Sequence, residues 1–488
     1  MSRTLILAVR EKLLSNSSQD QLHQALAEAT RGIAAPPRSR KLARVRISPA
    51  GYFAGAALLT FVSLILLRAH RDLAALILIA ATWFSVALLL TSDRLNFDGR
   101  MLSRSGPVAL LFRLLRGGAP RLAVEDVERV EVTTLRTLRR GGNVRYRYRI
   151  EISGKGQMFV FASGGESFRR MVKALLPPVP DYKLDARARE LRDHLVDAKA
   201  VRAQAADLGI APVSVLEETN ETIKIEEKHR RANHDQEASP DEAERAAQLR
   251  KVANDLRIVG RLRESAEAFR RALLVSAQDA WLIYEYARLL RSQAGAFGDA
   301  RLLSRACAAL KLSATRGADD ARLLERIGES FLEYGEPARA AKSFRLALET
   351  DEASYRAHLG LAEVALSEGK LAHVIHHYND AARIAPDRAT ARMARREADY
   401  YARLNDDEDY LASELRRMNW LEGANRVQHL AARVSFAALL VALIGPSVAQ
   451  VVAGLGWALA SSSVIAWSGA LITKRLLTSR GRVAESEV

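Results

Sequence analysis

The stretch ARLLERIGESFLEYGEPARAAKSFRLALET spans residues 321–350, and DEASYRAHLGLAEVALSEGKLAHVIHHYNDAARIAPD follows at 351–387. Both segments place small and apolar residues at matching positions, and Gly335 and Gly369 stand 34 residues apart. A self-similar period of this length is typical of stacked helix–turn–helix units. We therefore predict a helical repeat in which these glycines make the turn inside each helix pair and Gly328 lets the paired helices approach closely.

The two segments resemble the tetratricopeptide-repeat (TPR) family. The residues at the family's spacing are Leu324, Ile327, Gly328, Phe331, Gly335, Ala340, Phe344 and Ala347, and then His358, Leu361, Ala362, Ala365, Gly369, Val374, Tyr378, Ala381 and Pro386. An earlier unit from Leu249 to Leu273 fits less closely, and a divergent unit from Trp281 to Leu310 has a turn, Ser292 to Asp299, that looks lengthened. The resemblance implies an all-α TPR solenoid over 243–387, followed by capping helices over 388–432.

The resemblance also implies a concave groove, lined by the first helix of each pair, that accepts an extended peptide or a partner helix. At the family's spacing, the groove positions are Arg250, Asn254, Trp281, Tyr284, Arg288, Arg291, Glu325, Glu329, Leu359 and Glu363. Trp281 and Tyr284 are candidate anchors for a protein partner, because aromatic side chains often carry interface energy. Packing against a neighbouring helix is an equally open interpretation of these two residues.

Apolar segments near both ends of the chain predict two transmembrane helical hairpins, at 48–91 and at 434–473. In the first, five residues separate Ser48–Leu67 from Leu73–Thr91, and each stretch is long enough to cross the hydrocarbon core as a helix. In the second, no charged residue lies between Arg433 and Lys474. We expect its turn near Gly454–Gly456, where glycine permits a tight reversal. The alternative is a buried hairpin in a soluble protein.

The distribution of basic residues predicts which side of the membrane each soluble part faces. The 488 residues carry a formal net charge of +16, and much of the surplus flanks the apolar segments, in the N-terminal segment 1–47 and in the basic-to-acidic tail 474–488. Membrane flanking explains this surplus better than binding to nucleic acid does. The positive-inside rule then predicts a multi-pass protein of a bacterial inner membrane with its soluble domains in the cytoplasm. The single cysteine, Cys307, excludes an intrachain disulfide framework.

Between the first hairpin and the repeats, residues 96–177 change to the period of β-strands. Val144 to Ile152 alternate apolar with charged residues, and Phe168, Met171, Val172 and Leu175 give a following helix one apolar face. Strands that follow a transmembrane hairpin and end in one helix resemble the small α+β, pleckstrin-homology-like (PH-like) domains of bacterial membrane proteins. Arg145, Arg147 and Arg149 are candidate lipid-facing residues for anionic headgroups, although a solvated strand face is the alternative.

We predict a helical and disordered linker over residues 178–242. The sequence from Asp185 to Asp207 is charged and helix-like, and the stretch from Leu216 to Glu244 has too few apolar residues to build a core. His373, His376 and His377 have helical spacing for a metal, but no Cys, Asp or Glu completes the site in register except Asp380 nearby. We therefore expect no metal, no cofactor and no catalytic residue.

Together these features predict a multi-domain, non-enzymatic, membrane-anchored TPR scaffold or assembly factor that holds a protein partner at the cytoplasmic face of the membrane. The alternative function is that of an integral subunit of a transport or secretion complex. The apolar segments contain no ionisable residue at mid-membrane depth, which argues against an ion or proton pathway. Small residues in these segments allow helix association, so a homo-oligomer and a membrane-protein partner are both compatible with the sequence.

Overall fold

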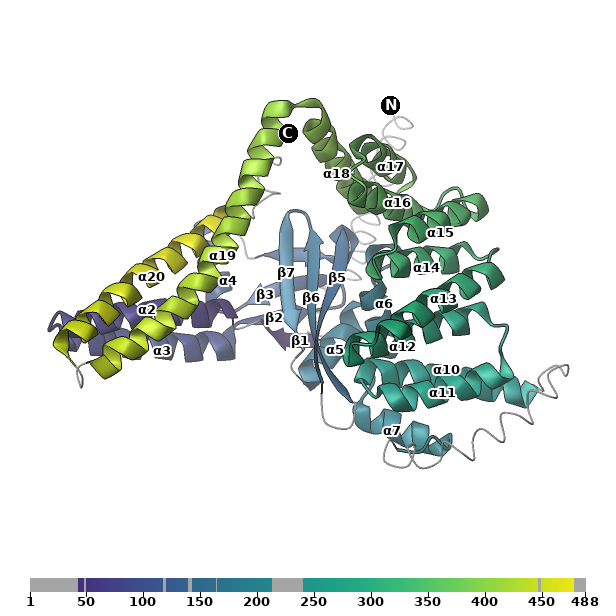
Figure 1. Cartoon of the computed structure of the whole chain (residues 1–488), viewed down its shortest axis with the longest axis horizontal. Helices are drawn as coiled ribbons and strands as arrows, with labels where there is room; N and C mark the ends of the chain where they lie inside the picture. Colours follow the sequence, from purple (N-terminus) through teal and green to yellow (C-terminus); the bar gives the residue numbers. More distant parts are fainter. Residues whose placement is uncertain are drawn as a thin grey trace, which may run out of the picture.

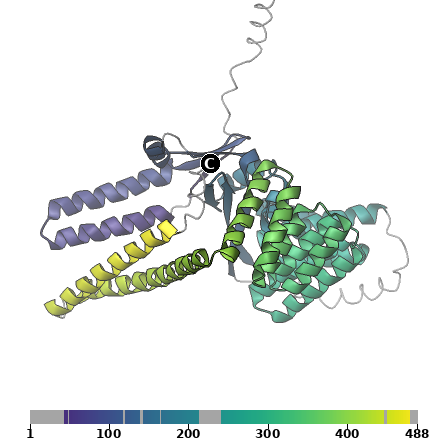
Figure 2. The same cartoon turned by 90° about the horizontal axis from the view of Figure 1, so that it is seen from above.

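The computed structural model describes residues 43–47, 50–116, 120–138, 143–163, 165–212, 240–445 and 449–477. Three parts follow one another across the molecule (Figure 1): apolar helices on one side, a strand-rich domain in the middle, and a stack of helix pairs on the other side. The view from above shows the same order (Figure 2). Most of the predicted 1–47 segment, part of the predicted linker and most of the predicted 474–488 tail lie outside the described residues.

Two antiparallel sheets form the middle domain. The strands are β1 Ala43–Arg46, β2 Arg94–Phe97, β3 Met101–Ser105, β4 Arg121–Ala123, β5 Arg129–Leu138, β6 Val144–Gly154 and β7 Gln157–Ala162. The first four make one sheet in the order β1-β2-β3-β4, and the last three make the other in the order β5-β6-β7. Strand β1 pairs with β2 from Ala43↔Phe97 to Arg46↔Arg94, so the first apolar hairpin is inserted between two paired strands. The domain thus begins before residue 96, because a strand ahead of the hairpin completes its first sheet.

Alternation along β6 places its apolar residues inside the domain. Ile150 and Ile152 are buried, and Phe161 of β7 and Phe97 of β2 are fully buried beside them in one core. Helix α5, Glu166–Leu175, covers this core with the apolar face that the sequence predicts. The β6–β7 turn contains Lys155 and Gly156, both with positive φ.

The first hairpin consists of α2, Ala50–Arg68, and α3, Asp72–Ser92. At its base, Asp93 is almost fully buried, and Arg104 of β3 donates to it from Nε at 3.1 Å and to the Tyr52 hydroxyl at 2.9 Å. An ion pair at this point attaches the hairpin to the sheet. Helix α4, Pro107–Arg116, follows β3 and contacts α3.

Helix pairs fill the other side of the molecule. The helices are α10 Pro240–Val259, α11 Leu262–Val275, α12 Ala280–Phe297, α13 Ala300–Arg316, α14 Ala321–Glu333, α15 Pro337–Thr350, α16 Tyr355–Ser367, α17 Leu371–Ile384 and α18 Arg388–Asp406. Gly335 and Gly369 adopt positive φ between the helices of their pairs, as the sequence predicts. Phe344 lies where Gly328 and Gly360 leave room, and a Cβ added at Gly328 would lie 2.6 Å from the Phe344 ring.

The divergent unit differs from the prediction. Its turn is not lengthened, because α12 continues through Ser292 to Phe297 and the reversal occurs at Gly298, which has positive φ. The helices themselves are longer, with 18 residues in α12 and 17 in α13 against 13 in α14 and 14 in α15.

The second hairpin is built from α19, Glu408–Ile444, and α20, Gln450–Leu477. The predicted turn at Gly454–Gly456 is wrong, since both glycines lie inside α20 and the chain reverses between Ile444 and Gln450. Gly456 instead permits close packing, because a Cβ added there would lie 2.8 Å from the Cα of Ala442. Glycine alone does not distinguish a turn from a close helix contact.

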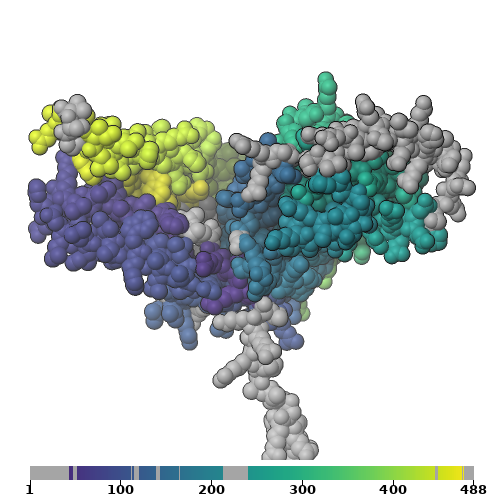
Figure 3. Space-filling model, turned by 90° about the horizontal axis from the view of Figure 1, so that it is seen from below, coloured from purple at the N-terminus to yellow at the C-terminus, as the bar shows by residue number. Residues whose placement is uncertain are grey.

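The two hairpins pack against each other as one bundle. Phe61 of α2 is buried with Ala438 of α19 and Ala460 of α20, and the guanidinium of Arg68 lies 5.9 Å from the Trp457 ring. Figure 3 shows the first hairpin, in purple, lying along α19 and α20, in yellow. Among the described residues, Asp72–Ser92, Glu408–Ile444 and Gln450–Lys474 are long and apolar enough to cross a membrane, and Tyr52–Arg68 is a shorter apolar helix.

The first half of the predicted linker is a packed part of the structure. It forms a 3₁₀ turn, Asp181–Lys183, and helices α6, Ala186–His194, and α7, Ala198–Asp207. Ala188, Leu191 and Val201 are fully buried in these helices. The helices agree with the helix-like sequence predicted from Asp185 to Asp207, but they pack into the protein and do not form a linker.

Candidate functional site

The concave face of the repeat stack is the candidate binding surface, and α6 already lies against part of it. Helix α6 contacts α10 and α14 of the repeats on one side and β5 of the strand-rich domain on the other, and Figure 1 shows it between the sheet and the stack. Its N-cap residue Asp185 accepts from the Ala188 backbone N–H at 2.6 Å and from the Val132 N–H of β5 at 2.9 Å. This carboxylate therefore both begins the helix and holds it to the sheet.

Glu190 of α6 is the centre of a buried ion network in the groove. Arg288 of α12 donates to it from Nε at 2.8 Å, and Arg257 of α10 donates from Nη1 at 3.1 Å. Burial alone would raise the pKa of Glu190, but the two guanidinium groups hold the pKa well below its usual range. Arg288 also pairs with Glu333 of α14, which accepts from Arg187 of α6 at 2.7 Å.

A second charge cluster lies one turn away along α14, around Glu329. Arg189 of α6 pairs with Glu329 of α14, and Arg356 of α16 donates to the same carboxylate from Nε at 2.8 Å. Only 4% of the Arg189 side chain and 12% of the Glu329 side chain are exposed. The arginines of α6 thus match carboxylates on the repeats, and the groove between α10 and α14 is occupied by the protein's own helix.

The candidate anchors Trp281 and Tyr284 have partners inside the stack. Trp281 donates from Nε1 to Asp320 at 2.8 Å, and the Arg326 guanidinium lies 5.1 Å from its ring. Tyr284 packs edge-on against Trp281 and is 6% exposed. These contacts favour the packing interpretation for both aromatic residues.

The other predicted groove residues divide between paired and open positions. Arg250 and Asn254 donate to Glu285, Arg291 lies 5.4 Å from the Tyr334 ring, and Glu325 accepts from Ser354. Arg288 and Glu329 are in the network described above. Leu359 and Glu363, on α16, line an open cavity.

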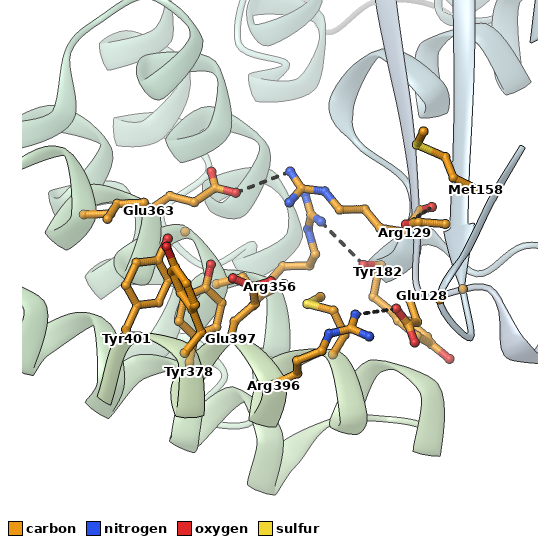
Figure 4. Close-up of a pocket in the computed structure, with 18 of the residues that line it drawn as sticks. Glu128, Arg129, Met158, Tyr182, Arg356, Glu363, Tyr378, Arg396, Glu397 and Tyr401 are labelled. Carbon is orange, nitrogen blue, oxygen red and sulfur yellow. Dashed lines mark hydrogen bonds and ion pairs between the residues drawn. The ribbon is translucent and has the colours of Figure 1, made fainter. Parts of the chain in front are cut away.

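This open cavity has a volume of about 560 Å³ and lies between α16, α17 and α18 on one side and β5 and the β6–β7 turn on the other. Figure 4 shows the charged and aromatic side chains that point into it. Arg129 lies 3.6 Å from Glu363, Arg396 pairs with Glu128 at 2.7 Å, and the rings of Tyr378 and Tyr401 stack with centroids 5.9 Å apart.

Most lining residues of the cavity were outside the sequence prediction. Arg129 and Met158 come from the strand-rich domain, and Arg396 and Tyr401 from α18. Three of the predicted groove positions line the cavity, namely Glu329, Leu359 and Glu363. The repeat pattern could not have indicated the residues of the strand-rich domain, because they reach the cavity through a contact between domains.

The three candidate lipid-facing arginines are exposed on β6. Arg149 pairs with Glu151 at 2.8 Å. At the same end of the strand, the Val144 N–H donates to the Gly260 carbonyl at 2.9 Å, and the Tyr148 hydroxyl donates to the Ile258 carbonyl at 2.9 Å. This end of β6 therefore lies against the first helix pair of the repeats.

One group of side chains among the described residues has the composition of a metal site. The potential ligand atoms of His358, His377 and Asp380 all lie within 4.8 Å of one another. His358 is on α16, so the spacing of the histidines along α17 does not indicate it.

No protein-family model and no curated protein matches the chain. Among solved structures, MamA is 18% identical over 34% of this chain and 94% of its own, with a TM-score of 0.26. YrrB, described as a TPR protein with an unusual peptide-binding site, is 16% identical over 43% of this chain and 98% of its own, with a TM-score of 0.26. A de novo designed 16-helix transmembrane nanopore is 15% identical over 59% of this chain, with a TM-score of 0.12. Because these TM-scores are low, the evidence for the repeat architecture is the set of helix pairs described above.

Proposed function

We propose that the chain is a membrane-anchored, non-enzymatic TPR scaffold or assembly factor that binds a segment of a protein partner in the open cavity at the α16–α18 end of the groove. The supporting observation is the cavity of about 560 Å³ that stays open beside a groove filled by α6. A segment of a protein partner suits this cavity better than a small metabolite does, because the two walls of the cavity come from different domains and carry both charged residues and tyrosines.

The apolar bundle supplies the anchor in this proposal. Three of its helices have the length and composition of membrane spans, and the fourth is a shorter apolar helix. Large apolar side chains cover its outer surface, such as Phe84, which is 73% exposed, and Ile465, which is 71% exposed. Apolar surface of this extent in a helical bundle is suited to lipid.

Helix α4 fits an interfacial position at the base of this anchor. Leu110 and Leu114 stand four residues apart, 61% and 84% exposed, with the exposed Arg113 between them. A short helix with an apolar side and basic residues, in contact with α3, has the character of a segment that lies in the headgroup region. We propose α4 as a lipid contact alongside the earlier hypothesis for Arg145, Arg147 and Arg149.

The partner site is tested by photo-crosslinking in native membranes. A photoreactive residue at Leu359 should give a discrete adduct with a protein, whereas the same residue at Leu312, exposed on α13, should not. Glu363→Arg should weaken the adduct formed at position 359. Adducts of equal yield at both positions, or none at position 359, would overturn the proposal.

The proposed cytoplasmic orientation is tested by thiol labelling. Cys307 is a poor probe, because it is 8% exposed and burial raises the pKa of its thiol. Leu312→Cys in a Cys307→Ala background puts an accessible thiol on the same helix. An impermeant reagent should label it only after the inner membrane is opened, and labelling in cells with an intact inner membrane would place the repeats outside.

A further inference from the structure

Two adjacent helices of the last repeat bring together two histidines and an aspartate. His358 lies on α16, and His377 and Asp380 lie one turn apart on α17. Nδ1 of His358 is 3.9 Å from Oδ2 of Asp380, and Nε2 of His376 is 3.2 Å from the same oxygen. The ring of His377 lies 5.9 Å from that of His358 and 5.2 Å from that of His376, measured between centroids.

Two nitrogens in this cluster are buried without a hydrogen-bond partner. They are Nδ1 of His358 and Nδ1 of His377. A buried polar atom without a partner costs free energy, and one explanation for such an atom in a native structure is a bound ion. Here one ring nitrogen of each histidine lies within 4.8 Å of a carboxylate oxygen of Asp380, so a single ion could bind all three side chains.

We propose that His358, His377 and Asp380 bind one divalent transition-metal ion of the zinc class, with His376 or water in a further position. Two imidazoles and a carboxylate are a ligand set that zinc accepts in a tetrahedral arrangement. Tetrahedral ligands at about 2.0–2.1 Å from zinc are about 3.3 Å apart, so the side chains must close by roughly an ångström or more. Because the ligands come from α16 and α17, the ion would hold the last helix pair together beside Tyr378, which lines the cavity. The metal site does not depend on the proposed partner.

The test uses the full chain in detergent, freed of metal with a chelator and titrated with Zn²⁺ by calorimetry and with Co²⁺ by visible absorption. We expect one equivalent of either ion to bind, Co²⁺ to give the strong visible bands of a tetrahedral site, and Zn²⁺ to raise the unfolding temperature. His358→Gln and Asp380→Asn should each weaken binding at least about tenfold, as the loss of even an outer-shell partner does in known sites.

His373→Gln is the matched control, because His373 is an exposed histidine on the same helix. It should leave the affinity unchanged. If His373→Gln abolishes binding and His358→Gln does not, the ion sits on the exposed pair His373 and His377, and the proposed site is wrong. Absence of binding by the unmodified chain would also overturn it. Circular dichroism of each metal-free variant separates loss of a ligand from loss of the fold.

Discussion

The two halves of the repeat groove meet the rest of the chain in different ways. Over α10, α12 and α14 the groove is filled by α6, whose Glu190 and Arg189 are paired and largely removed from water. Over α16 and α18 it is open, and the Arg129–Glu363 pair that spans it is nearly half exposed on both sides. The same curved surface thus serves as a fixed domain interface at one end and as an accessible cavity at the other.

The difference shows what buried and exposed charges contribute. A buried ion pair is a weak source of net stability, but removal of one member leaves an unpaired charge and is strongly destabilising. The network around Glu190 therefore fixes where α6 lies. An exposed pair is replaceable at little free-energy cost, which suits a surface where a partner's groups must substitute for the protein's own.

The largest effect is expected at the filled end. Glu190→Ala leaves Arg257 and Arg288 buried without their shared carboxylate, and we expect the free energy of unfolding to fall by about 3–5 kcal/mol. Chemical denaturation of the purified chain, followed through the soluble helices, measures the change. Glu166→Ala, which removes an exposed pair with Arg170, is the control and should change stability by no more than about 0.5 kcal/mol. Equal effects of the two variants would contradict the role given to Glu190.

A smaller effect is expected where the two halves join. Phe344 lies between Gly328 of α14 and Gly360 of α16, and a Cβ at position 360 would overlap its ring. Gly360→Ala should therefore lower the free energy of unfolding by about 1–3 kcal/mol, despite the better helix propensity of alanine. Gly423→Ala in α19 is the matched control, since nothing lies within 4 Å of the added Cβ. If both substitutions stabilised the protein, the close approach of α16 to the Phe344 ring would not be required for stability.

The sequence predicts the helix pairs well because each depends on local features. Spacing places Gly335 and Gly369 at turns, and the apolar face of α5 follows from Phe168 to Leu175. The position of α6 is not predictable in this way. Its segment is highly charged, and these charges are buried only because they pair with Arg257, Arg288 and Glu329, which lie on helices distant in the sequence. For the same reason, the sequence left open whether Trp281 and Tyr284 are anchors for a partner or pack within the stack, because the contacts of Trp281 with Asp320 and Arg326 depend on the fold.

Acid should weaken the filled half through its carboxylates. Burial raises the pKa of Glu333, but Arg288 and Arg187 outweigh it and hold the pKa at about 2. A carboxylate whose pKa is lower in the folded state than in the unfolded state stabilises the protein at pH values above its unfolded-state pKa. This stability is lost as the pH falls toward the folded-state pKa. Protection of the α6 amides from hydrogen exchange should stay constant from pH 7 to pH 5, after correction for the intrinsic rate. By pH 4, about 1 kcal/mol should be lost for one such group. Glu333→Gln should remove its share of this dependence, and an unchanged profile would exclude Glu333 as the titrating group.

The smallest effect is expected at the open end, from the pair between Arg129 and Glu363. Their charged atoms are 3.6 Å apart and both side chains are nearly half exposed, so solvent screens their attraction. A double-mutant cycle with Arg129→Ala and Glu363→Ala should give a coupling energy of about 0–1 kcal/mol, and neither single variant should move α6. A coupling energy above about 2 kcal/mol would mean that the pair locks the cavity shut, as Glu190 locks α6 in place. A weak coupling combined with loss of the crosslink at Leu359 would separate the two roles, because the charges would then serve partner binding and contribute little to the fold.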